Sequence, residues 1–270
     1  MYLKRKFTFD IASLVPYINW IYFFHAWQVK GPTEQQRLRQ EAMTLLQREG
    51  GNYHTHALLM IADANSDGDN LVIHGTTLPL LRQQHHETGS PCLCLADYVR
   101  PIEKGIPDTV GVFATTTDAA MVHDYHDDDY LQMMMQLLAD RLAEATAERL
   151  HQMVRTDLWG YAPNESLSIS ELHQEKFQGI RPAVGYPSMP DTGVNFIINK
   201  LLGLEEIGIR LTKNGAMMPH ASVTGLMIAH PKARYFSIGN ITEEQMADYA
   251  RRRGITTEEA RKFLQPLLAN

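Results

Sequence analysis

The longest regular hydrophobic pattern of the chain lies between Asp118 and Thr156, where apolar residues return every three or four positions with charged residues between them. Such spacing is typical of an amphipathic helix that packs one face onto a core. The pattern predicts one long helix or two consecutive helices, built on Leu131, Met134, Leu138, Leu142, Ala145 and Leu150. We expect this segment to form the central helix of the fold.

Short β-prone runs separated by turn sequences lie on both sides of this helix, and further helical patterns flank them. The predicted strands cover 56–61, 71–73, 110–115, 207–211, 222–229 and 235–238. The predicted helices cover 9–14, 19–27, 32–50 with Thr33 as N-cap, 196–204, 243–253 and 257–268. Helices before and after a sheet, without regular alternation, favour a single α+β domain over residues 1–270.

Composition excludes several classes of protein. Of the 270 residues, 44% are hydrophobic and 21% are charged, which is ordinary for a globular protein and excludes collagen-like and disordered chains. The formal net charge of −6 would repel a phosphate backbone, so we expect no nucleic-acid partner. The N-terminus lacks the apolar stretch of a signal peptide, and the run 20–27 is too short to cross a bilayer. We therefore expect no membrane partner. On a strand, Cys92 and Cys94 would point to opposite faces and could not easily form a disulfide, which favours a reducing cytoplasm.

Few residues suggest self-contained chemistry. The segment HDYHDDD at 123–129 has the composition of a metal site, but aspartates at the start of a helix also oppose its dipole favourably, and we prefer that interpretation. The dinucleotide-binding, P-loop, nucleophile-elbow and CxxC motifs are absent from the sequence. The residues therefore predict no catalytic residue and no metal.

Two Pro- and Gly-rich segments, 179–191 and 230–239, have the features of a ligand site. Arg181 can contact a carboxylate through two N–H groups, and Tyr186 or Tyr235 can stack on a planar ring. Together they suit a zwitterionic ligand that carries an aromatic base. The alternative is that Arg181 pairs with an acid on a helix and the tyrosines belong to the core.

The sequence strongly resembles the C-terminal activation domain of cobalamin-dependent methionine synthase. The resemblance extends over nearly the whole chain, in motifs that follow one another in order. They include FDIASLVPYINWIYFFHAWQVKG at 9–31, LADRLAEATAERLH at 138–151, WGYAPNESLSISEL at 159–172, GIRPAVGYPSMPD at 179–191 and HPKARYFSIG at 230–239.

The resemblance implies a C-shaped α+β domain with a central twisted antiparallel sheet that binds S-adenosylmethionine in a shallow groove. In the family, this domain caps a cobalamin module, so that an electron from flavodoxin or a related reductase and a methyl group from S-adenosylmethionine restore methylcobalamin from cob(II)alamin. The ligand-binding residues that it implies are Asn19, Glu144, Arg181, Pro182, Ala183, Gly185, Tyr186, Tyr235 and Phe236.

The chain also departs from the family pattern. Asn19 stands where the family has an aspartate, so we expect one charged contact to a cationic ligand to be lost. Residues 192–195 differ from the family's H-T-E-K, and Met189 replaces a cysteine, so the rim of the groove is altered.

No homocysteine, folate or cobalamin module precedes the matching segments, so we expect the chain to work with a partner. One hypothesis is an activation module that serves a cobalamin-dependent methyltransferase in trans, with a flavodoxin-like or other reductase. The alternative is a diverged, non-catalytic paralogue with a binding or regulatory role. A free-standing methyltransferase is disfavoured because the sequence offers no acceptor site and no catalytic base.

Overall fold

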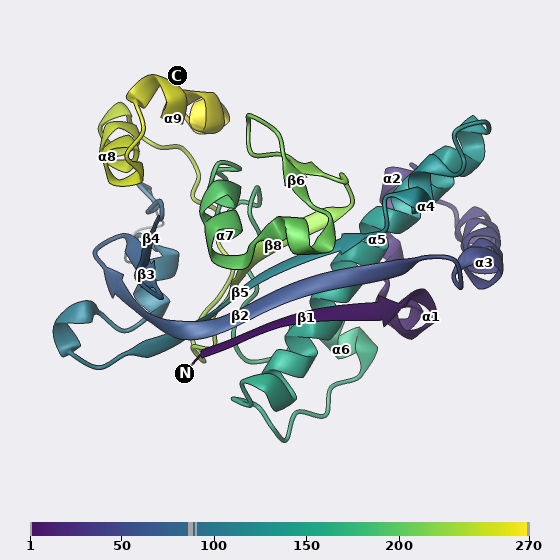
Figure 1. Ribbon diagram of the computed structural model, residues 1–270, viewed down its shortest axis with the longest axis horizontal. Coiled ribbons are helices and arrows are strands. Elements are labelled where there is room, and N and C mark those ends of the chain that lie inside the picture. The colour runs from purple at the N-terminus through teal and green to yellow at the C-terminus, as the bar shows by residue number, and fades with distance from the viewer. Residues whose placement is uncertain (1, 86–88, 90, 269–270) are drawn as a thin grey trace.

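A curled antiparallel sheet of six strands forms the centre of the computed structural model, which describes residues 2–85, 89 and 91–268 (Figure 1). The strand order is β4-β3-β2-β5-β8, and β1 also pairs with β2. The strands are β1 (Tyr2–Asp10), β2 (His54–Asp67), β3 (Asn70–Ile73), β4 (Thr76–Pro79), β5 (Asp108–Thr117) and β8 (Ser222–Met227). This antiparallel sheet with flanking helices confirms the predicted α+β class.

The sheet is covered by helices on both faces. Along β2, Leu58 and Met60 belong to a core shared with α7 (Val194–Leu202), whereas Leu59 and Ile61 belong to a core shared with the long helix α5. Successive side chains of a strand point to opposite faces, so a strand buried on both faces has an unbroken apolar run. This explains the continuous hydrophobic sequence at 57–62.

The central helical pattern forms two consecutive helices, α4 (Ala120–His123) and α5 (Asp129–Met153), which confirms one of the two predicted alternatives. The Asp128 carboxylate caps α5 by accepting a hydrogen bond from the Leu131 N–H at 3.0 Å. The helix crosses one face of the sheet and ends in a π-helical turn, Val154–Leu158 (Figure 1). The acidic stretch therefore starts a helix, and among the described residues no group of three or more His, Cys, Asp or Glu is placed to hold a metal.

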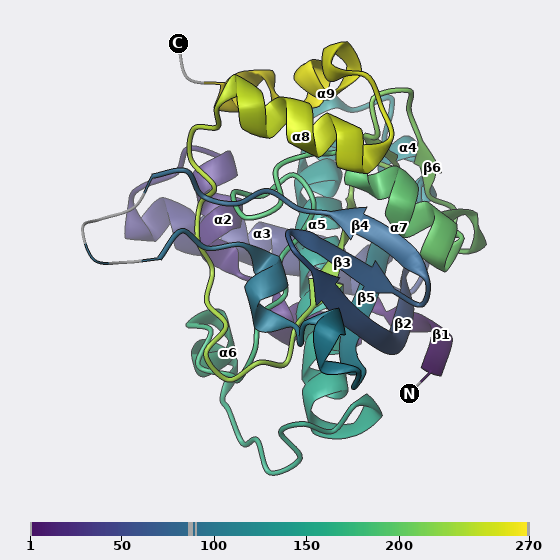
Figure 2. The ribbon, with the colours of Figure 1, turned by 90° about the vertical axis from the view of Figure 1, so that its left-hand side faces the viewer.

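The remaining helices form two groups around the sheet. The N-terminal helices pack with α5 into a second core, while α8 and α9 pack together near β4, on a different side of the molecule (Figure 2). Their bounds are α1 (Ile11–Leu14), α2 (Trp20–Ala26), α3 (Pro32–Glu49), α6 (Ile169–His173), α8 (Glu243–Arg253) and α9 (Thr257–Leu264). None of the helices in the described part of the chain has the length and apolar character needed to span a membrane.

The N-terminus differs from the sequence prediction. Residues 2–10 form the strand β1, and the helix expected at 9–14 is confined to Ile11–Leu14. Leu3, Phe7 and Phe9 are half-buried on one side of β1, a strand alternation that the prediction missed because basic residues interrupt it.

Three other predictions were wrong in detail. The N-cap of α3 is Gly31 rather than Thr33, because Pro32 with its fixed backbone occupies the first helical position. A strand was expected at 207–211, but only Arg210–Leu211 form one, β6, which pairs with β7 (Met217–Met218). Residues 235–238 form an irregular loop rather than a strand.

Candidate ligand-binding groove

Residues 180–184 run beside β8 and extend the sheet at that edge. Ile180 and Ile228 exchange backbone hydrogen bonds of 2.9 and 3.0 Å, and the Val184 N–H donates to the Thr224 carbonyl at 2.9 Å. The backbones of β8 and residues 180–184 approach each other closely at Gly225, where an added Cβ would lie 2.3 Å from the Pro182 carbonyl oxygen. Glycine in β8 therefore allows this segment to dock.

The extended backbone of this segment decides where its side chains point. Ile180 and Val184 are buried in the core on the α7 side of the sheet. Alternation then turns Arg181 and Ala183 toward the opposite face, where α5 lies, and Ala183 packs against that core. The arginine is thus directed at the polar residues of α5.

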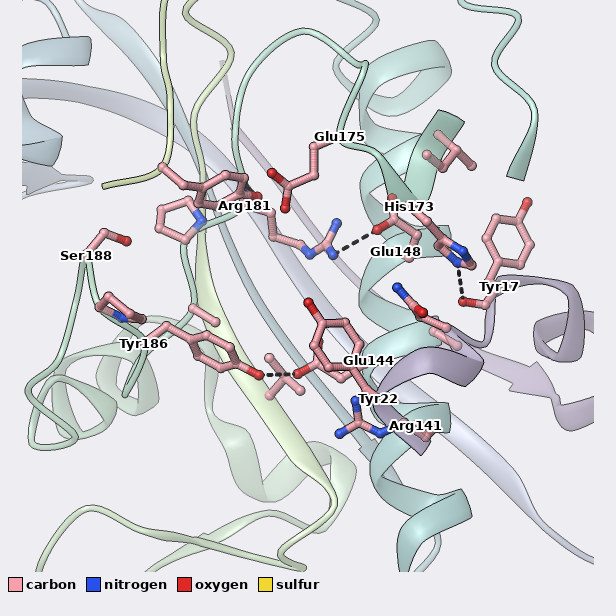
Figure 3. A pocket seen from close by; sticks show the side chains of 18 of the residues that line it. Tyr17, Tyr22, Arg141, Glu144, Glu148, His173, Glu175, Arg181, Tyr186 and Ser188 are labelled. Carbon is pink, nitrogen blue, oxygen red and sulfur yellow. Dashed lines mark hydrogen bonds and ion pairs between the residues drawn. The ribbon is translucent and has the colours of Figure 1, made fainter. Parts of the chain in front are cut away.

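Arg181 meets two polar residues of α5. Its Nη2 donates to Oε2 of Glu148 at 3.0 Å (Figure 3). Its Nη1 lies 3.1 Å from Nδ1 of His151. The side chains of Arg181 and Glu148 are only 13% and 11% exposed. Burial opposes the guanidinium charge, but Glu148 and Tyr235 outweigh it and raise the pKa of Arg181. Arg181 therefore pairs with a helix acid, as the first half of the alternative expected.

Tyr186 faces the same helix from a tight turn. Gly185 has a φ of +87°, which favours glycine, and its N–H donates to the Met189 carbonyl at 2.8 Å. The Tyr186 hydroxyl donates to Oε1 of Glu144 at 2.6 Å. Loss of water around the phenol, and then the Glu144 charge, raise the pKa of Tyr186. Because 51% of Tyr186 is exposed, it is not a core residue.

Tyr235 approaches Arg181 from the loop after β8. Its hydroxyl accepts a hydrogen bond of 2.9 Å from the Arg181 backbone N–H, and 37% of the residue is exposed. Phe236 follows it and packs against two neighbouring cores. The loop 230–239 therefore contacts the Arg181 segment, and neither tyrosine fits the core alternative.

The N-terminal helices and α6 supply the remaining wall. Asn19 is the N-cap of α2, and its Oδ1 accepts a hydrogen bond from the Ile21 N–H at 3.2 Å. The Nε2 atom of His173 forms a 3.1 Å hydrogen bond with the Tyr17 carbonyl oxygen, and this bond connects α6 to the N-terminal segment (Figure 3). Glu175, with a φ of +56°, lies close to Arg181, and loss of water, reinforced by Glu148, raises its pKa.

These elements enclose a groove of about 570 Å³, within the range of small-molecule sites. Eight of the nine residues implied by the resemblance line it, namely Asn19, Glu144, Arg181, Pro182, Ala183, Tyr186, Tyr235 and Phe236. The ninth, Gly185, shapes the turn instead of lining the groove. The structure thus brings the candidate residues together, while their contacts with a ligand stay a prediction.

Several lining residues were missed by the sequence analysis, namely Tyr17, Tyr22, Arg141, Glu148, His173, Glu175 and Ser188. One signal could have revealed part of this set. Arg141, Glu144 and Glu148 are spaced by three and four positions, so they share one face of α5.

The groove combines charges of both signs on rigid elements. Arg181 offers N–H donors to a carboxylate, while Glu144, Glu148 and Glu175 can attract a cation. Among the residues that the structure describes, Oε1 of Glu148 is buried without a hydrogen-bond partner. Such an oxygen favours a donor from outside the fold. The chemistry therefore suits a zwitterionic ligand.

Fold and groove together define an α+β domain with a groove suited to a small charged ligand at one edge of its sheet. The chain matches the family model of the vitamin B12 dependent methionine synthase, activation domain, over residues 10–254, and it belongs to that family. It is also similar to a crystal structure of the MetH reactivation domain bound to AdoHcy, with a TM-score of 0.94 and 37% sequence identity over 99% of this chain and 91% of that one. These comparisons confirm the family resemblance inferred from the sequence.

Proposed function

We propose that the groove binds S-adenosylmethionine. The observation that carries this proposal is the pairing of Arg181, suited to the methionine carboxylate, with the acids Glu144, Glu148 and Glu175, suited to the ammonium and sulfonium groups. Tyr186, Tyr235 and Phe236 offer aromatic surface for the adenine or the sulfonium. The AdoHcy bound to the similar MetH domain supports this choice, because it is the same molecule without the transferable methyl group.

We further propose that the chain supplies this ligand in trans to a cobalamin-binding methyltransferase module, in the cytoplasm. The cobalamin belongs to the partner and provides the cobalt that receives the methyl group. One electron from a flavodoxin-like or other reductase reduces cob(II)alamin. The methyl group of S-adenosylmethionine would then pass to the partner's reduced cobalamin, which supplies the electron pair of the new bond, while the electron pair of the broken C–S bond stays on sulfur. Methylcobalamin and S-adenosylhomocysteine are the products, and this chain orients the methyl donor.

One observation favours the alternative of a diverged binding or regulatory paralogue. Asn19 is neutral and its oxygen caps α2, so a carboxylate expected from the family is absent from the groove. Arg181, Glu144 and both tyrosines line the groove, which supports the activation role, and for that reason we prefer it.

A reconstituted reaction tests the role in trans. A methionine synthase lacking its own activation domain is held as cob(II)alamin with reduced flavodoxin and S-adenosylmethionine, and the absorbance spectrum is followed with and without this chain. We expect methylcobalamin to form only when the chain is present. Ligand binding without methylcobalamin formation would favour the regulatory alternative.

A further inference from the structure

The buried histidine behind Arg181 has a contact pattern that fixes its protonation. Nδ1 of His151 lies 3.1 Å from Nη1 of Arg181. A guanidinium only donates hydrogen bonds, so Nδ1 has to be the acceptor and carries no proton. The ring's Nε2 lies 3.1 Å from the Tyr161 hydroxyl, where a ring N–H can donate to the phenol oxygen. The contacts on both sides thus match one neutral tautomer, with the proton on Nε2.

The surroundings of His151 keep the ring neutral. The residue is 0% exposed, and the edge of its ring meets the Phe177 ring at a centroid distance of 5.0 Å. Burial, then Arg181 and Arg155, hold the pKa of His151 well below its ordinary value. The charged and titratable groups around it are Glu148 on the same helix, Arg155 in the π-turn, Tyr161 after that turn and Arg181 opposite. A protonated ring would bring a second cation against the Arg181 guanidinium, at a cost in free energy.

Its neighbours also restrain the ring. Arg155 is fully buried, donates to both oxygens of Glu165 at 2.7 and 2.8 Å, and lies 4.1 Å from the Phe177 ring centroid. These contacts fix the π-turn and the segment that carries Tyr161. His151 therefore lies between the Tyr161 hydroxyl and the Arg181 guanidinium.

We infer that His151 is a positioning residue for ligand binding, whose neutral imidazole orients the Arg181 guanidinium together with Glu148. Nη1 is held by the ring and Nη2 by the carboxylate, which leaves the other N–H groups of Arg181 for the carboxylate of the ligand. This inference rests on the proposed binding of S-adenosylmethionine.

Matched substitutions separate positioning from simple packing. In His151→Asn, Oδ1 can replace Nδ1 as an acceptor, whereas His151→Leu has a similar volume and no acceptor. By calorimetric titration with S-adenosylmethionine, we expect His151→Leu to lose affinity by about tenfold to a hundredfold and His151→Asn to stay within about threefold of the unaltered chain. Equal affinity in the two folded variants would overturn the positioning role.

Nitrogen NMR of the ligand-free protein tests the tautomer independently of binding. At neutral pH we expect an unprotonated Nδ1 signal and a protonated Nε2 signal, assigned among the twelve histidines by their disappearance in His151→Asn. A proton on Nδ1 would overturn the inference even if His151→Leu did not fold. If the unaltered chain failed to bind S-adenosylmethionine, the proposed function and the ligand role of His151 would both be overturned. If the chain bound the ligand but carried the His151 proton on Nδ1, only the role of His151 would be overturned.

Discussion

The Tyr186 hydroxyl donates a 2.6 Å hydrogen bond to Oε1 of Glu144. This bond joins the glycine turn at the edge of the sheet to the central helix, so two residues 42 positions apart in the sequence form one wall of the site. It also orients the Glu144 carboxylate without neutralising its charge. The wall is therefore shaped for a ligand with positive charge.

Tyr186→Phe should weaken S-adenosylmethionine binding while leaving the fold intact. The lost hydrogen bond no longer orients Glu144, and a contribution of about 0.5 to 1.5 kcal/mol is typical of such a bond. The melting temperature should hardly change because 51% of Tyr186 is exposed. Calorimetric titration and thermal unfolding of the same samples measure both effects. Unchanged affinity with a lowered melting temperature would mean that the bond serves only stability.

Arg181→Ala should weaken ligand binding by about 1 to 3 kcal/mol, the range for losing a charge-assisted contact and leaving its partner buried. The variant should also be less stable, because Glu148 is left as a buried carboxylate without its cation. Arg251→Ala is the matched control, since it breaks an exposed ion pair with Asp248 on α8. If Arg181→Ala bound the ligand as well as Arg251→Ala does, Arg181 would not be part of the site.

Asn19→Asp should strengthen binding of S-adenosylmethionine by about threefold to tenfold, because the added carboxylate faces a cationic ligand. Binding of S-adenosylhomocysteine, which lacks the sulfonium charge, should change much less. Aspartate and asparagine cap helices equally well, so α2 should keep its stability, whereas Asn19→Ala should cost about 1 kcal/mol. An equal gain for both ligands in parallel titrations would contradict an electrostatic role for position 19.

Asp191→Asn should destabilise the fold by about 3 kcal/mol. The Asp191 carboxylate is buried, accepts hydrogen bonds from the Gly193 N–H at 2.6 Å and the Tyr249 hydroxyl at 2.7 Å, and pairs with Arg253. Removing its charge leaves the buried Arg253 guanidinium without a counterion. Urea unfolding measures the loss, with the more exposed Asp248→Asn as the control. Equal stability of the two variants would show that the buried pair does not anchor α8 to the segment 179–191.

The two cysteines should differ in reactivity. Burial raises the pKa of the Cys94 thiol to about 12, whereas Cys92 is partly exposed. An unfolded thiol ionises at about pH 8.5, so the stability from the buried neutral thiol is complete below that pH and is lost as pH rises toward about 12. A thiol reagent at pH 8 should label Cys92 rapidly and Cys94 only after unfolding. Rapid labelling of Cys92→Ser would contradict this burial.

The sequence could predict the features that depend on neighbouring residues, namely the positions of helices and of the glycine turn. The spacing of apolar residues located α5, and the helical patterns at 243–253 and 257–268 located α8 and α9, whose N-caps in the structure are Thr242 and Thr256. The glycine turn around Tyr186 was recognisable because its residue types demand such a backbone. The candidate groove residues came from the family resemblance, and the structure confirms their proximity.

Long-range pairing could not be predicted in the same way. Arg181 meets Glu148 and His151 because residues 180–184 dock beside β8, a contact that depends on Gly225 more than forty positions further along. Periodicity within one segment carries no information about which edge of a sheet that segment joins. The edge strand β1 was not predicted for a related reason. Basic residues interrupt its hydrophobic alternation, and its strand conformation follows from its pairing with β2.

Calorimetric titration of the purified chain with S-adenosylmethionine, and with S-adenosylhomocysteine in parallel, tests the central claim most directly. We predict saturable binding of one ligand per chain, at micromolar to sub-millimolar concentration, with a loss of affinity in Arg181→Ala. The absence of binding at millimolar ligand, from a sample that unfolds cooperatively, would contradict the proposed function.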